Sequence, residues 1–202
     1  MDPRQYRTRR SIINAFLTLR SEKPIEKITV RELAEQAEIH KATFYLHYHD
    51  IYELSEMLEQ EEIDDILSGL SEPLMLLTDP ERFNEELYCL LMAHESMIGI
   101  LFSGSRESLF TRRLEERIKE YIYELRPEYK EDLEMNVVFT YLIQGGYHAY
   151  MEYRDRDAER VLMAVDRMAS SVLRLYTQKP ESKERAKTGA VSHIIKKVRQ
   201  DE

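Results

Sequence analysis

Hydrophobic residues recur every three to four positions along most of this chain, and no segment alternates apolar and polar residues with a period of two. A period near 3.6 places apolar side chains on one face of an α-helix. The pattern therefore predicts an all-α protein. Its helices are expected at about 4–20, 28–37, 41–47, 50–69, 80–102, 106–125, 130–153 and 158–177.

The segment 28–54 contains two short predicted helices joined by a tight turn, followed by the start of a third. Thr29 stands three residues before Glu32, a capping-box pattern that begins the first helix. The second helix, 41–47, is only two turns long and needs a neighbour to be stable. Its apolar face consists of Ile39, Phe44 and Tyr48. The opposite face is left free for another partner.

The chemistry of that free face suits DNA. It carries Lys41, Ala42, Thr43, Tyr45 and His47. Lysine pairs with phosphates or guanine edges, hydroxyl groups donate to phosphate oxygens, and methyl groups contact thymine methyls. The segment is therefore predicted to be a helix-turn-helix, with 41–47 as its recognition helix.

The string ITVRELAEQAEIHKATFYLHYHDIYEL resembles the N-terminal signature of the TetR/AcrR family of transcriptional regulators, over about residues 8–56. The resemblance implies a DNA-binding domain at 1–49 and a helical effector-binding and dimerisation domain at 50–177. It also implies a repressor that binds a palindromic operator as a homodimer and is released by a small-molecule ligand. The family usually has Gly where Glu38 stands, Ser or Thr at His40, and Lys at Ile51.

The predicted DNA-binding set extends beyond the recognition helix. By resemblance, the start of the first helix also reaches phosphates or a groove edge, and histidines near DNA gain charge as the pH falls. The set is Thr29, Arg31, His40, Lys41, Ala42, Thr43, Tyr45, His47 and His49. Four arginines at the start of the chain are also expected near phosphates: Arg4, Arg7, Arg9 and Arg10.

Charge is distributed unevenly along the 202 residues. The whole chain has a net charge of −9, but residues 1–50 hold nine Lys and Arg against seven Asp and Glu, a net of +2. The rest carries −11, so one end is suited to a polyanion and the other is not. Residues 51–72 contain eight acidic residues and no basic one, and we interpret this acidic face as solvated surface.

The later helices predict two further sites. Polar tips on apolar faces suggest an effector pocket lined by Tyr88, His94, Phe102, Tyr141, Gln144 and His148, although such side chains also occur in ordinary cores. Small residues among large ones in 130–177 predict a four-helix dimer interface. That interface comprises Tyr141, Gly145, Gly146, Ala149, Val165, Met168 and Val172.

Other classes of function find little support. Cys89, His94 and His148 lack metal-site spacing, so neither a metal nor another cofactor is expected. No nucleophile elbow, phosphate loop or HExxH motif occurs, so the chain is not expected to be an enzyme. A single cysteine cannot form an intrachain disulfide, and no signal peptide or membrane-length apolar run is evident. These features suggest a cytoplasmic protein.

Two alternatives stay open at the level of the sequence. The changes at Glu38, His40 and Ile51 are compatible with a relative that binds another regulator as a coactivator. The chain could also be a small-molecule-binding helical protein with a vestigial head. Residues 178–202 form a basic tail, for which we expect partial disorder or a short docked helix.

Overall fold

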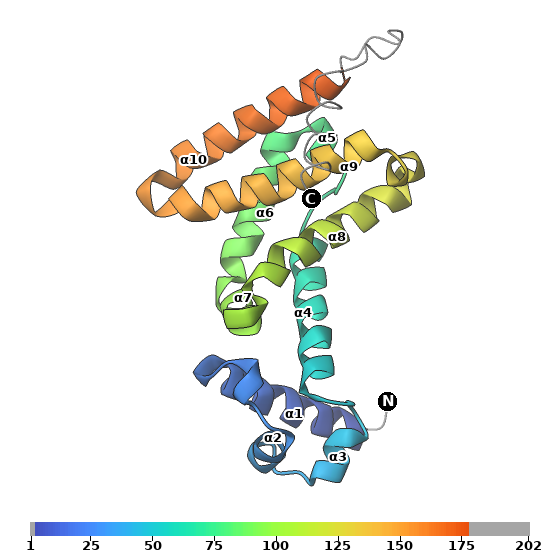
Figure 1. Cartoon of the computed structure of the whole chain (residues 1–202), viewed down its shortest axis with the longest axis vertical. Coiled ribbons are helices and arrows are strands. Elements are labelled where there is room, and N and C mark those ends of the chain that lie inside the picture. The colour runs from blue at the N-terminus through green and yellow to red at the C-terminus, as the bar shows by residue number, and fades with distance from the viewer. Residues whose placement is uncertain (1–2, 178–202) are drawn as a thin grey trace, which may run out of the picture.

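The computed structural model describes residues 3–177, and all regular structure in this range is helical (Figure 1). The first part contains α1 (Pro3–Glu22), η1 (Ile25–Lys27), α2 (Val30–Gln36), α3 (Lys41–Tyr45) and α4 (Ile51–Ser68). The second part contains α5 (Met75–Thr78), α6 (Pro80–Ala93), α7 (Glu95–Leu101), η2 (Gly104–Arg106), α8 (Glu107–Leu125), η3 (Pro127–Lys130), α9 (Leu133–Thr140), the π-helical turn η4 (Tyr141–Gly145) and α10 (Gly146–Thr177). The predicted tail at 178–202 lies outside the described residues.

Helices α1, α2 and α3 form a head at one end of the molecule (Figure 1). Its centre consists of fully buried side chains: Ile12 and Phe16 of α1, Leu33 of α2 and Phe44 of α3. Burying a side chain of this size contributes roughly 1.5–3 kcal/mol. Because α2 and α3 are too short to be stable alone, this shared core is what holds them in place.

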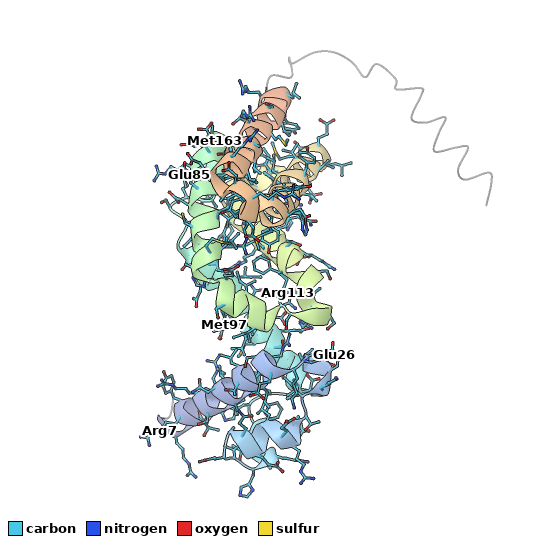
Figure 2. All side chains as sticks on the ribbon, turned by 90° about the vertical axis from the view of Figure 1, so that its left-hand side faces the viewer. Arg7, Glu26, Glu85, Met97, Arg113 and Met163 are labelled. Atoms are coloured by element: carbon cyan, nitrogen blue, oxygen red, sulfur yellow. The ribbon has the colours of Figure 1, made fainter. Side chains whose placement is uncertain are left out.

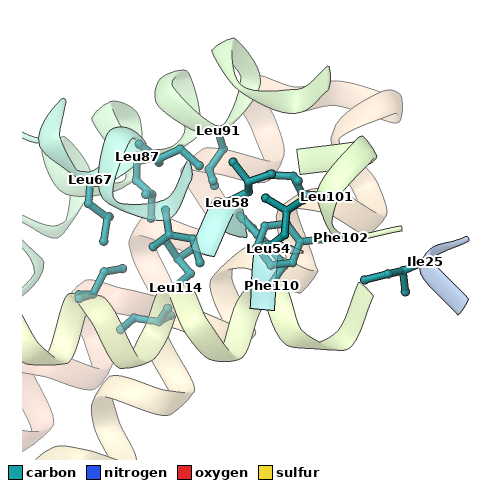
Figure 3. Packing of buried hydrophobic residues seen from close by; sticks show 14 of the residues in the cluster. Ile25, Leu54, Leu58, Leu67, Leu87, Leu91, Leu101, Phe102, Phe110 and Leu114 are labelled. Carbon is teal, nitrogen blue, oxygen red and sulfur yellow. The ribbon is translucent and has the colours of Figure 1, made fainter. Parts of the chain in front are cut away.

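Helix α4 runs from the head into the body (Figure 1). Asp50 caps its start, because the Asp50 carboxylate accepts a hydrogen bond from the Glu53 N–H at 2.8 Å. Along its length α4 contributes apolar side chains to the body core, where they pack with residues of α6, α7 and α8 (Figure 3). The labelled members of this core on α4, α6, α7 and α8 include Leu54, Leu58, Leu87, Leu91, Leu101 and Leu114.

The acidic residues of α4 are not simply solvated, so that interpretation of the sequence is wrong. Glu61 pairs with Arg9 of α1 at 2.6 Å, and Asp64 pairs with Arg117 of α8 at 2.6 Å. Fully buried Glu59 is bonded to arginines of η2 and α8. Helix α4 is therefore held on several sides by cations that come from distant parts of the chain.

The outer layer of the body consists of α9, η4 and α10 (Figure 1). Asp157 leaves the helical conformation, with φ −171° and ψ 87°, and divides α10 into two arms that fold back on each other as a hairpin. This break confirms the predicted separation of two helices near 155–157. The expected helix at 130–153 is interrupted by the π-helical turn η4.

Two other expectations need correction. The predicted helix at 80–102 breaks at His94 into α6 and α7, and the predicted loop before it contains the single turn α5. Apolar spacing continues on both sides of His94, so periodicity alone does not reveal the break. None of the helices in residues 3–177 is long and apolar enough to span a bilayer.

Candidate DNA-binding surface

Helix α2 begins where its cap predicts. The Thr29 hydroxyl accepts a hydrogen bond from the Glu32 N–H at 3.2 Å, so half of the capping box forms. The Glu32 carboxylate instead pairs with Lys23, which joins α2 to the end of α1. The guanidinium of Arg31 is exposed and donates to Glu35 one turn later, at 2.8 Å. A phosphate or base that approaches Arg31 would compete with this surface pair.

The turn between α2 and α3 has the hydrogen bonds of a Schellman motif. The Ile39 N–H donates to the Ala34 carbonyl at 3.0 Å, and the Glu38 N–H donates to the Glu35 carbonyl at 3.3 Å. Glu38 has a positive φ of 55°, the only one among non-glycine residues in the described part of the chain. This left-handed conformation explains why glycine is the better residue at this position, and the geometry nevertheless forms with glutamate.

The buried side of α3 is aromatic. Phe44 is fully buried, and its ring centroid lies 5.8 Å from that of Tyr48, which is also buried. His40 stands at the N-cap and forms no side-chain capping bond, so helix start here depends on the backbone. The predicted division of this segment into a buried and a free face is therefore present in the structure.

The free face of α3 is polar at its start and aromatic at its end. Lys41, Ala42 and Tyr45 are exposed, whereas Thr43 and His47 are half-buried. The Lys41 ammonium has no ion-pair partner among the described residues, and so it is available to a phosphate or a base edge. His49 is exposed beside α3, with its ring 3.3 Å from the Asp50 carboxylate.

Sequence reasoning missed one member of this surface. Leu46 is 84% exposed immediately after α3, an unusual position for an aliphatic side chain in a small head. Leu46 stands between Tyr45 and His47, which were both predicted for the free face, and this position could have identified it. An exposed leucine on this face offers a methyl contact to a thymine.

Arg9 joins Tyr48, in the segment after α3, to α4. Its Nε donates to the Tyr48 hydroxyl at 3.3 Å, and its Nη2 donates to Glu61 at 2.6 Å. These hydrogen bonds raise the pKa of Arg9. Arg9 therefore faces the protein rather than a phosphate, whereas Arg7 lies exposed near the outer end of α1 (Figure 2).

The structure does not gather the six residues predicted for an effector pocket around one cavity. Tyr88 stacks on Tyr150 in the core at 4.1 Å, and Phe102 packs edge-on against Phe110. His94 stands at the break between α6 and α7, and its Nδ1 lies 2.8 Å from the carboxylate of Glu62. Gln144 donates to buried Glu115, whereas Tyr141 and His148 are exposed on the outer layer.

Most residues predicted for the dimer interface do come together. An open apolar hollow of about 220 Å³ lies between η4 and the two arms of α10. Its lining consists of Tyr141, Leu142, Gly145, Gly146, Ala149, Val165, Met168 and Ala169. Val172 lies beside it, in a neighbouring hollow that shares Tyr141 and Met168. The described residues include no cluster of three or more His, Cys, Asp and Glu side chains able to hold a metal.

A short exposed helix, supported by a second helix across a tight turn and carried on a helical body, defines a helix-turn-helix protein. No family model matches the sequence, and no curated protein matches it significantly. Among solved structures, the fold matches that of a protein from Shewanella sp. PV-4 that is provisionally assigned to the tetR family of transcription regulators. The TM-score is 0.53 at 17% identity, over 82% of this chain and 95% of the other. This likeness confirms the predicted fold.

Proposed function

We propose that this chain is a DNA-binding transcriptional regulator that places α3 in the major groove. The observation that carries the proposal is the surface of α3, where exposed Lys41, Tyr45 and Leu46 stand on buried Phe44 and Tyr48. A helix held rigidly from below can present its outer side chains to base edges at little entropic cost. The tetR-like fold supports the same assignment.

The working form is proposed to be a two-fold dimer joined through the outer layer of the body. Val137, Tyr141 and Met168 are each more than half exposed, although they are large apolar side chains. Together with the hollow on α10 they form an apolar patch of the kind that marks an interface. A symmetric pair also meets a need of recognition, because one short helix contacts too few base pairs to single out a genomic site.

Selection from random DNA tests the proposal. The full chain would be incubated with a random duplex library, bound duplexes recovered, and the affinity for the enriched sequence measured at several salt concentrations. A regulator of this kind should enrich a two-fold symmetric sequence, and its affinity should fall steeply with salt. Recovery of no preferred sequence, with affinity no greater than for scrambled duplex, would favour the coactivator alternative and contradict the proposal.

A further inference from the structure

Arg20, in the last turn of α1, is a buried cation that reaches from the head into the body. Its side chain is almost inaccessible, with 3% of the residue exposed. Its Nη2 donates to the carbonyl oxygens of Leu101 and Ser103, at 3.2 and 3.1 Å. These carbonyls lie at the C-terminal end of α7, where unpaired carbonyls carry partial negative charge. Burial lowers the pKa of Arg20, but a guanidinium remains charged in proteins.

A second contact joins the same two parts of the molecule. The Ser105 hydroxyl in η2 donates to the carboxylate of Glu26 in η1. Figure 2 shows Glu26 on the side of the head that faces the body. The segment 101–106, which connects α7 to α8, is therefore bonded to the head at two places. We call this segment the corner.

The corner is also fixed to α4. Arg106 donates to Glu59 at 2.8 Å, and Glu59 is fully buried and accepts a further bond from Ser55. Arg113 of α8 lies 3.3 Å from the same carboxylate. Helix α4 begins shortly after α3. The corner therefore contacts both helices through which the head is connected to the body, α1 and α4.

The contacts of the head to the body thus have two parts with different roles. Arg9, Tyr48 and Glu61 connect α1, the segment after α3, and α4, next to the proposed DNA surface. The bond from Arg20 to the end of α7 lies at the other end of α1 and is the buried, charged contact to the body proper. Because α1 is bonded near both of its ends, through Arg9 and through Arg20, it cannot rotate about either contact alone.

We propose that Arg20 is a positioning residue that fixes the direction of the head relative to the body. In the dimer of the proposed function, on which this inference rests, that direction sets the separation of the two α3 helices. A fixed separation makes the second half-site bind at a high effective concentration. Loss of the Arg20 contact lowers that concentration and leaves the contacts of one head to one half-site intact.

The test compares wild type with Arg20→Met on duplexes selected by the wild type from random DNA. Three probes are used: the selected palindrome, the palindrome with its half-sites moved by one or two base pairs, and a duplex with one half-site scrambled. The variant should bind the single half-site within twofold of wild type. It should bind the selected palindrome about tenfold more weakly and lose less affinity than wild type when the spacing changes.

Two variants accompany this comparison. Arg112→Met removes an exposed guanidinium from the body and should reproduce the wild-type spacing profile. Ser105→Ala removes the exposed contact to Glu26, keeps Arg20 in place, and should broaden the profile to a smaller extent. If Arg20→Met does not fold, as judged by circular dichroism, Arg20→Lys takes its place, because it keeps the buried charge but cannot donate to both carbonyls as the guanidinium does. An unchanged spacing profile in Arg20→Lys would equally overturn the role of Arg20.

The outcomes separate the two claims. An unchanged spacing profile, or a loss on the single half-site equal to that on the palindrome, would overturn the role of Arg20 alone. A wild type that selects no sequence would overturn the proposed function and this inference with it.

Discussion

The backbone of Glu38 shows how one residue can depart from a pattern without changing the fold. A side chain with a Cβ costs roughly 1–2 kcal/mol in the left-handed conformation, and Glu38 has φ 55°. The neighbouring bonds of the turn form nevertheless. The packing of α2 against α3 around Phe44 therefore offsets this cost.

Glu38→Gly should raise the free energy of unfolding by about 0.5–1 kcal/mol, because glycine adopts this conformation without strain but loses more chain entropy on folding. Urea titration followed by circular dichroism measures the change. Glu38→Ala is the matched control, since it removes the same carboxylate and keeps the Cβ. Equal stabilisation by both variants would show that charge, not backbone strain, is the cause.

A second residue-scale prediction concerns Asp166, which is buried in α10 against α6. Asn84 donates to its carboxylate at 2.7 Å, and burial, together with Glu81 and Glu85 nearby, raises the pKa of Asp166. A raised carboxyl pKa means that the folded state disfavours the charged form, so stability is lost as the pH rises through that pKa. Among the described residues, no Lys or Arg side chain pairs with this carboxylate.

Asp166→Asn should therefore stabilise the protein at pH 7, because it keeps the bond from Asn84 and removes the buried charge. The difference from wild type should shrink as the pH falls from 7 to about 3, because the wild-type carboxyl is protonated in both states only below the pKa of an unfolded aspartate, about 3.9. Unfolding free energies across that range measure it, with Asp65→Asn as an exposed control. A difference that stays constant with pH would contradict this account.

At the scale of elements, local signals in the sequence were the informative ones. Thr29 caps α2 as predicted, Asp50 caps α4 at the predicted helix start, and the apolar period separated Phe44 and Tyr48 from the free face of α3. These features depend on residues a few positions apart. The likeness to a tetR-type fold confirms the all-α architecture that they predicted.

What the sequence did not reveal depends on residues far apart in the chain. The partners of the acidic face of α4 lie some 50 positions away, on α1 and α8. The sequence assigns the tyrosines predicted for an effector pocket to helices. It does not show whether their side chains point toward one place, because that depends on how each helix is rotated in the bundle. Tyr88 therefore lies in the core and Tyr141 on the surface.

Helix α3, proposed above as the recognition helix, gives a prediction at the same scale. Lys41→Ala should weaken binding to the selected duplex and reduce the slope of log affinity against log salt by about one, because one phosphate contact releases about one counterion. Fluorescence anisotropy at several salt concentrations measures both. Lys130→Ala, an exposed lysine of the body, should change neither. A wild-type slope in Lys41→Ala would remove Lys41 from the DNA contacts.

For the whole molecule, the two glycines of the outer layer are not equivalent. A Cβ on Gly146 would lie 3.3 Å from both the Tyr88 hydroxyl and Val165, so substitution there crowds the chain's own core. A Cβ on Gly145 meets nothing within 4 Å. Gly145 is therefore the position that tests contact with a second copy.

Gly145→Leu should raise the dimer dissociation constant at least about tenfold, equivalent to about 1.4 kcal/mol. The reason is that a large side chain holds apart helices that the glycine allows to approach. Sedimentation equilibrium measures the change. Gly99→Leu, which likewise adds a side chain in open space but on α7, should leave the dimer intact. An unaltered dimer in Gly145→Leu would exclude this face from the interface.

The most direct test of the account is the composition of the complex with the selected duplex, measured by native mass spectrometry. Two heads, each reading one half-site through α3, require two chains on each symmetric duplex. We expect a complex of two chains and one duplex, with no stable complex on a scrambled duplex of equal length. Equal binding to the scrambled duplex, or a single chain on the intact palindrome at full affinity, would contradict it.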